Sequence, residues 1–220
     1  MSGSDKTCRK KIGLFFRDER GWADFFITRI GLILFAAVLL LAAFKVYPMF
    51  HERESQAYLD AVTSDIASKI EAVDSTTIPG YRYNYIFDSK DRNIKIEIST
   101  EFIIAHGNLT SEMWGEHKLV HAEPLITYVY PPNSKWSNTS GFRKYIGDEI
   151  GSGKNGEASS PLDLSNDRVK VDAIFDQAKN ELSRVPFIPD MNRSLIMEKV
   201  MVYYLNRGET LSRDYVFVYQ

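Results

Sequence analysis

The segment Ile30–Phe44 reads IGLILFAAVLLLAAF, an uninterrupted apolar run in a chain of 220 residues. As an α-helix this run rises about 22 Å, which is less than the roughly 30 Å hydrocarbon core of a bilayer. Extending the helix to Phe25–Tyr47 gives about 35 Å. The longer segment includes Arg29 and Lys45 near its ends, where long side chains reach the headgroup region. The sequence therefore predicts one transmembrane helix over residues 25–47.

Charge is distributed unevenly on the two sides of this segment. Residues 1–29 contain seven Lys or Arg and four Asp or Glu, whereas residues 49–220 contain 19 and 25. Because Lys and Arg near a span remain on the cytoplasmic side, we expect residues 1–24 to form a basic cytoplasmic leader. The protein would then be a single-pass protein of the cell membrane, with its C-terminal domain extracytoplasmic. A cleaved signal peptide ending near Leu41-Ala42-Ala43 is the alternative.

The remaining residues have the composition of one folded domain. The chain is 44% apolar and 13% aromatic, and about 170 residues after the span suffice for one hydrophobic core. The single cysteine, Cys8, lies in the leader, so the domain contains no internal disulfide. The domain is acidic and has no cluster of Lys and Arg, which argues against nucleic-acid binding.

Helical periodicity continues beyond the apolar segment. Residues 48–75 place apolar side chains three and four residues apart, with polar side chains on the other face. The apolar positions are Leu59, Val62, Ile66, Ile70 and Val73. We expect an amphipathic helix that continues from the span, is kinked by Pro48 and packs on the domain. A break at Pro48 followed by an unrelated surface helix is the alternative.

Residues 76–220 predict an α+β domain with an antiparallel sheet and one or two helices. Alternating side chains at residues 81–87 and 94–98 indicate two strands, joined as a hairpin by Asp88–Asn93. Further strands are expected within residues 124–132, 199–205 and 214–219, and helices at 142–150 and 167–184.

The N-terminal residues carry a motif that resembles a known family. A short basic leader ends at Arg20-Gly21, and the hydrophobic segment that follows continues as an amphipathic helix into a β-rich domain. Over residues 1–75 this arrangement resembles the type IV pilin superfamily, in particular the archaeal pilin-like and archaellin-like proteins.

That resemblance implies both processing and assembly. In the family a membrane peptidase cleaves after a Lys-Gly or Arg-Gly pair, which implies cleavage between Gly21 and Trp22, after Arg20. The hydrophobic helices of the mature subunits then bundle as the core of a filament. The chain departs from the family five residues into the mature sequence, where Phe26 replaces the usual glutamate and Asp24 is the nearest acid.

Three Asn-X-Ser/Thr triplets lie in the expected extracytoplasmic domain, at Asn108, Asn138 and Asn192. Such triplets are acceptors for N-glycosylation when a glycosylation machinery reaches them. The proposed topology places all three outside the cytoplasm, so we treat them as candidate glycosylation sites. Unmodified polar loop residues are the alternative.

The densest polar patch covers residues 106–121. Its ionisable residues include His106, Glu112, Glu116, His117 and His121. His117 and His121, four residues apart, would share one face of a helix and could hold an ion there. Their order differs from the HExxH motif, and neither a glycine-rich phosphate loop nor a nucleophile elbow is present. We therefore expect no enzyme activity, no catalytic or metal-binding residue and no cofactor.

These features favour a membrane-anchored extracytoplasmic structural protein. The expected role is a pilin-like subunit, or an accessory component, of a cell-surface filament or envelope assembly. Its partners would be the membrane and either copies of itself or other subunits, through the apolar helix. One alternative is a membrane-tethered module that binds a ligand or partner. A second is a metal-dependent envelope enzyme that uses the patch at residues 106–121.

Overall fold

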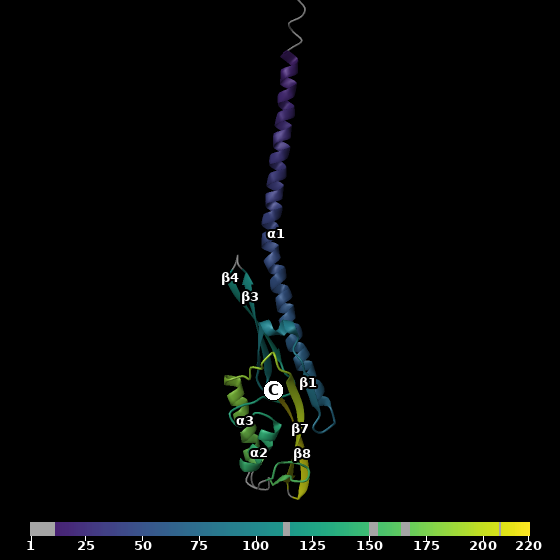
Figure 1. Ribbon diagram of the computed structural model, residues 1–220, viewed down its shortest axis with the longest axis vertical. Helices are drawn as coiled ribbons and strands as arrows, with labels where there is room; N and C mark the ends of the chain where they lie inside the picture. Colours follow the sequence, from purple (N-terminus) through teal and green to yellow (C-terminus); the bar gives the residue numbers. More distant parts are fainter. Residues whose placement is uncertain (1–11, 112–114, 150–153, 164–167, 207) are drawn as a thin grey trace, which may run out of the picture. The chain divides into compact units, whose positions relative to one another are not determined.

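The computed structural model has an α+β fold and describes residues 12–111, 115–149, 154–163, 168–206 and 208–220 (Figure 1). Cys8 and Glu112 lie outside the described residues. The chain divides into two compact units, residues 1–53 and 54–220. Helix α1 (Ile12–Ser75) contributes to both units. Its helical backbone continues through Pro48, so the break considered at that residue is not present.

The first unit consists, in its described part, of the N-terminal portion of α1. Leu, Ala, Phe and Ile dominate this portion, and Leu and Ala have high helix propensity. Every described side chain between Trp22 and Glu54 is exposed. Among the described helices, α1 is the one that is long and apolar enough to cross a membrane.

The second unit contains two β-sheets. In the larger sheet the strands follow the order β1 (Arg82–Tyr85), β7 (Leu195–Asn206), β8 (Glu209–Tyr219) and β5 (Val129–Tyr130), and β6 (Leu162–Asp163) also pairs with β7. The smaller sheet has the order β2 (Ile94–Ile98), β3 (Phe102–Ser111) and β4 (Gly115–Pro124). Pairing is antiparallel except between β5 and β8 and between β6 and β7, where it is parallel.

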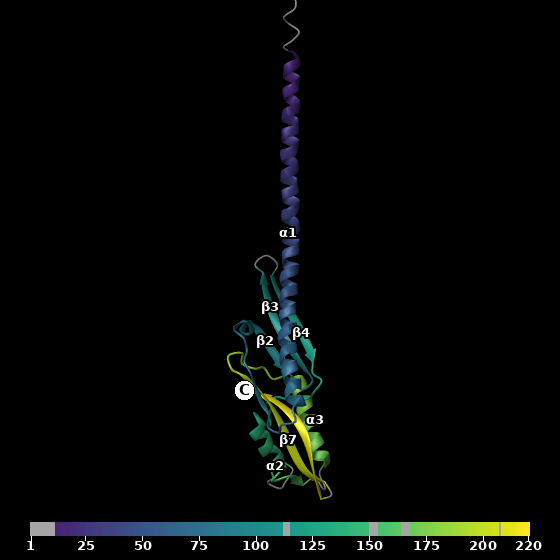
Figure 2. The same ribbon diagram turned by 90° about the vertical axis from the view of Figure 1, so that its right-hand side faces the viewer.

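The C-terminal portion of α1 packs against strands of both sheets. The predicted apolar stripe is confirmed, because Leu59, Val62, Ile66, Ile70 and Val73 are all buried. Four of these five residues share one core cluster with strands of both sheets, including Ile96 of β2 and Val216 of β8. Figure 2 shows this part of the α1 ribbon passing along β2, β3 and β4. The C-terminal portion of α1 thus contributes to two of the three core clusters among the described residues of unit 2.

Helices α2 (Thr139–Glu149) and α3 (Arg168–Arg184) cover the opposite face of the larger sheet (Figure 1). This second core is aromatic: the rings of Phe175 and Tyr215 stack at 4.0 Å, and those of Phe142 and Phe217 lie 4.6 Å apart. Because both faces of the sheet are covered, five consecutive residues of β8, Tyr215–Tyr219, are buried.

The predicted hairpin between residues 81–87 and 94–98 is wrong. Strand β1 pairs with β7, with Tyr85 opposite Leu195, and β2 pairs with β3 instead. Between β1 and β2 lies a 3-10 helix, η1 (Ser89–Asn93), whose Asp91 is buried. The Asp91 carboxylate accepts hydrogen bonds from the Tyr58 hydroxyl of α1 and from the Asp88 backbone amide. The bond from Tyr58 joins this connection to α1, and the strands on its two sides belong to different sheets.

Two further expectations need correction. The strand expected within residues 124–132 is shorter, since β5 contains Val129–Tyr130 and pairs in parallel with β8. The described residues of the 106–121 patch are not helical, because residues 106–111 lie in β3 and residues 115–121 in β4, which pair antiparallel. The helices expected near 142–150 and 167–184 are confirmed as α2 and α3.

Candidate functional site

The most extensive candidate surface is the apolar part of α1 in the first unit. Large apolar side chains point outward on all sides of the helix, from Trp22, 64% exposed, to Phe50, 66% exposed. The Arg29 guanidinium lies 4.3 Å from the centre of the Phe25 ring. The described ion pairs do not include one between Asp24 and Arg29. The cation is therefore held against an aromatic face near one end of the apolar segment.

The residues of the expected processing site lie in α1. The backbones of Arg20 and Gly21 are helical, and the side chain of Arg20 is outside the described part of the chain. The Trp22 side chain is exposed, and its ring lies 5.4 Å from that of Phe26, one turn along the helix. The aromatic residues after the Arg-Gly pair thus form a continuous exposed surface.

Two of the three candidate glycosylation asparagines have described, exposed side chains. The Asn138 carboxamide oxygen accepts a hydrogen bond from the Gly141 amide at 2.8 Å, which caps the N-terminus of α2. Asn192 donates through its side-chain nitrogen to the Asp190 carboxylate at 3.1 Å. The backbone amide and side chain of Asn192 lower the pKa of the Asp190 carboxyl. The backbone of Asn108 lies in β3 opposite Lys118, and its side chain is outside the described residues.

The β3–β4 hairpin separates the histidines of the 106–121 patch. His106 lies opposite Val120 and Ala105 lies opposite His121, so His106 and His121 are on opposite faces of the hairpin. On a strand, residues four apart lie about 13 Å from each other. The possibility that His117 and His121 share an ion on one helical face is therefore ruled out, because the backbones of both residues lie in β4.

His106 faces charged residues of β2. Its Nε2 atom lies 3.5 Å from Oε1 of Glu97, and that same oxygen accepts a hydrogen bond from the Lys95 ammonium at 2.6 Å. The Lys95 ammonium, and to a smaller extent His106, lower the pKa of the Glu97 carboxyl. One carboxylate therefore already has a permanent cation beside it, which leaves this face poorly suited to a metal ion.

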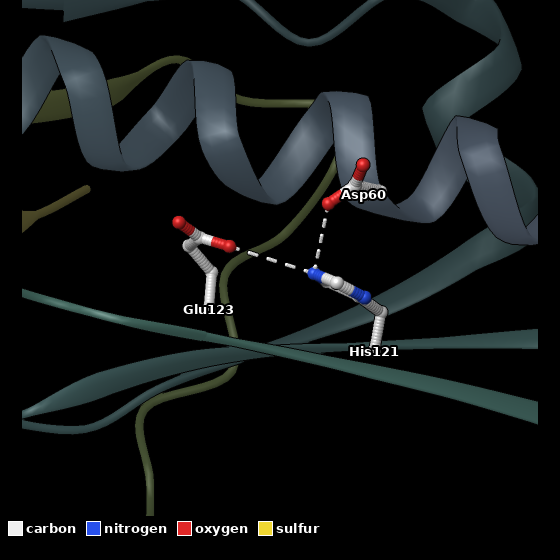
Figure 3. A group of neighbouring side chains, drawn as sticks. All are labelled: Asp60, His121 and Glu123. Atoms are coloured by element: carbon white, nitrogen blue, oxygen red, sulfur yellow. Dashed lines mark ion pairs between the residues drawn. The ribbon is translucent and has the colours of Figure 1, made fainter.

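On the other face, His121 lies between two carboxylates (Figure 3). Its Nε2 atom is 3.2 Å from Oδ1 of Asp60 in α1 and 3.5 Å from Oε2 of Glu123 in β4. The three donor atoms lie within 4.8 Å of one another. The Nε2 atom is buried, and neither contact has the geometry of a hydrogen bond. The arrangement is a mixed nitrogen and oxygen donor set of the kind that divalent metals bind.

The sequence could have predicted only two of these three donor residues, His121 and Glu123. His121 and Glu123 are two residues apart, a spacing that places side chains on the same face of a strand but not of a helix. A strand assignment for residues 115–124 would have paired them. Asp60 joins them through tertiary packing, in which Leu59 of α1 contacts Ala105 and Leu119 of the hairpin.

No family model, no curated protein and no solved structure matches this chain. The likeness to archaeal pilin-like proteins thus stays a prediction from the N-terminal residues.

Proposed function

We propose that α1 anchors this protein in a membrane and that unit 2 is an extracytoplasmic domain of a cell-surface filament or envelope assembly, as a pilin-like subunit or accessory component. The observation that supports the proposal is the apolar surface of α1 between Trp22 and Phe50, exposed all round in a chain whose second unit has its own cores. Such a helix is stable in lipid or against other apolar helices, but not in water.

The residues at the ends of the apolar segment support a transmembrane position. Trp22 and Tyr47 are amphipathic rings of the kind that lie at the membrane–water interface. Arg29 and Lys45 have long side chains whose charges reach the headgroups. The excess of Lys and Arg in residues 1–29 favours a cytoplasmic N-terminus and an extracytoplasmic unit 2.

The different surroundings of the two portions of α1 support a role in assembly. Its C-terminal portion uses an apolar stripe to complete the core of unit 2, whereas none of the described side chains of its N-terminal portion belongs to a core cluster. Small residues at Gly31, Ala36 and Ala43 would let neighbouring helices approach closely in lipid. Packing of these helices would supply the contacts of a filament core or of a smaller oligomer.

Topology and membrane insertion are tested on cells that express the full chain with epitope tags at both ends. Protease added to intact cells should remove the C-terminal tag and leave the N-terminal tag protected, until detergent makes both accessible. Carbonate at alkaline pH should leave the chain in the membrane fraction. Release of the uncut chain by carbonate, or digestion of the N-terminal tag in intact cells, would overturn the proposed anchor or its orientation.

A further inference from the structure

The distances around His121 match those between the ligands of a bound ion. In a tetrahedral zinc site with bonds of about 2.0 Å, neighbouring ligand atoms are about 3.3 Å apart. The separations from Nε2 to the Asp60 and Glu123 oxygens, 3.2 and 3.5 Å, bracket that value. Both oxygens flank the ring nitrogen without hydrogen-bond geometry, as ligands do when an ion lies between them. The donor oxygens of Asp60 and Glu123 lie within 4.8 Å of each other, so these two carboxylates would approach each other when three ligands close around one ion.

The charges at this position also favour a divalent cation. Among the described residues, no Lys or Arg forms an ion pair with Asp60 or Glu123. Two carboxylates around a singly charged imidazolium leave one negative charge uncompensated. A neutral imidazole with a divalent ion balances both carboxylates.

Gln56 can orient the histidine for this role. Its side-chain amide is 3.4 Å from Nδ1 of His121, one turn of α1 before Asp60. When Nε2 binds a metal, Nδ1 carries the proton and needs an acceptor. Turning the Gln56 amide places its oxygen there, so Gln56 acts as a positioning residue and not as a ligand.

The exposure of the three side chains leaves a path for the ion. His121 and Glu123 are 22% and 29% exposed, whereas Asp60 is 59% exposed. Water can therefore reach the site beside Asp60 and occupy the remaining coordination position. Such a three-ligand set with one open position is suited to a first-row transition ion, because the imidazole nitrogen disfavours Mg²⁺ and Ca²⁺.

We propose that Asp60, His121 and Glu123 bind one divalent transition-metal ion, of which Zn²⁺ is the representative, and that the ion links α1 to β4. The site lies within unit 2 and does not depend on how α1 is anchored. A bound ion would connect residue 60 to residues 121 and 123 and so stabilise the packing of the hairpin on the helix.

The test uses the full chain, purified in detergent and stripped with a chelator. Equilibrium dialysis with Zn²⁺ should give one ion per chain that millimolar Mg²⁺ does not displace. The variants Asp60→Asn, Glu123→Gln and His121→Ala should each weaken Zn²⁺ binding by about tenfold or more, and Gln56→Leu by about tenfold. Asp60→Asn is the most conservative of these at an exposed position, so it keeps the test valid if His121→Ala does not fold.

The matched control is His106→Ala, which removes a histidine from the other face of the same hairpin and should leave Zn²⁺ binding unchanged. Co²⁺ should give the intense visible absorption of a four- or five-coordinate site in the wild type and lose it in Asp60→Asn. Absence of stoichiometric Zn²⁺, or equal binding by the wild type and by Asp60→Asn and Glu123→Gln, would overturn the proposal and leave an ion pair of a protonated His121 with its two carboxylates.

Discussion

The ammonium of Lys199, on β7, donates a hydrogen bond of 2.6 Å to the backbone carbonyl oxygen of Asp74, in the last turn of α1. Lys199 is 7% exposed, and its other contacts are the Thr76 carbonyl at 2.8 Å and the Asp214 carboxylate at 2.9 Å. The last carbonyl groups of a helix have no intrahelical partner and carry partial negative charge. A buried cation therefore caps α1 at the point where it meets the larger sheet.

Replacing this cap should destabilise unit 2. In Lys199→Met the two carbonyl groups lose their donor and Asp214 loses its cation, so we expect the free energy of unfolding to fall by at least about 2 kcal/mol. Urea unfolding followed by near-ultraviolet circular dichroism measures the change. Lys90→Met, at an exposed position of η1, is the matched control and should remain within about 0.5 kcal/mol of the wild type. Equal stability of the two variants would contradict the capping role.

Alkaline pH should destabilise unit 2 through the partly buried Tyr130 and the buried Tyr215 of its aromatic core. Burial raises the pKa of Tyr130 from 10.0 to about 12, and burial also raises that of Tyr215, whose ring lies 5.7 Å away. A folded-state pKa above the unfolded value means that stability is intact below pH 10 and is lost as the pH rises toward 12. Between pH 10 and 12 the free energy of unfolding should therefore fall less in Tyr130→Phe than in the wild type, with a difference of at most about 3 kcal/mol. An identical decline in the wild type and Tyr130→Phe would refute the assignment to this residue.

Processing can be tested at Gly21. If a pilin-type peptidase acts after Arg20-Gly21, the natural protein begins at Trp22, and Gly21→Val retains residues 1–21 because the peptidase requires a small residue there. Mass spectrometry of the intact protein measures both masses. Gly31→Ala is the control, since an added methyl group meets no atom within 4 Å and should leave processing intact. A natural protein that keeps residues 1–21 would favour a plain anchor, and one that starts near Phe44 would indicate an ordinary signal peptide.

Assembly through the apolar segment can be separated from simple anchoring. An anchor needs only hydrophobicity, whereas helix association in lipid depends on close packing at small residues. Ala36→Leu combined with Ala43→Leu should leave membrane insertion intact and reduce cross-linked oligomers several-fold. The control exchanges Ile33→Leu and Leu40→Ile, which keep the volume of large side chains and should preserve the oligomers. Undiminished cross-linking in the alanine double variant would favour a membrane-tethered binding module.

The spacing of apolar residues predicted the helices and strands that can be recognised from a single continuous segment of sequence. The spacing of Leu59, Ile66 and Ile70 identified the buried face of α1, because one helix face meets one core. The β3–β4 hairpin was not predicted, because histidines and short polar residues interrupt the alternation of apolar and polar side chains expected of a half-buried strand. The strand partners were not predicted either, because β1 pairs with β7, which lies more than 100 residues further along the chain and has no local signal for the pairing.

The candidate metal ligands illustrate the same limit. Glu123 and His121 are neighbours on one face of β4, but the sequence alone did not distinguish that strand from a helix. Asp60 lies on the polar side of α1, where sequence reasoning places solvent. Its approach to His121 follows from the contact of the adjoining Leu59 with the hairpin, which no local pattern encodes.

The position of β8 determines when unit 2 can mature during biosynthesis. Residues Tyr215–Tyr219 contribute to the two large apolar clusters, and β8 follows every other described strand of this unit in the chain. Until β8 has been synthesised, the apolar stripe of α1 in the nascent chain lacks the strand residues Val216 and Val218 that pack with it in the folded unit. A chain exported through a membrane would therefore cross in an unfolded state and close its cores only after the final strand has arrived.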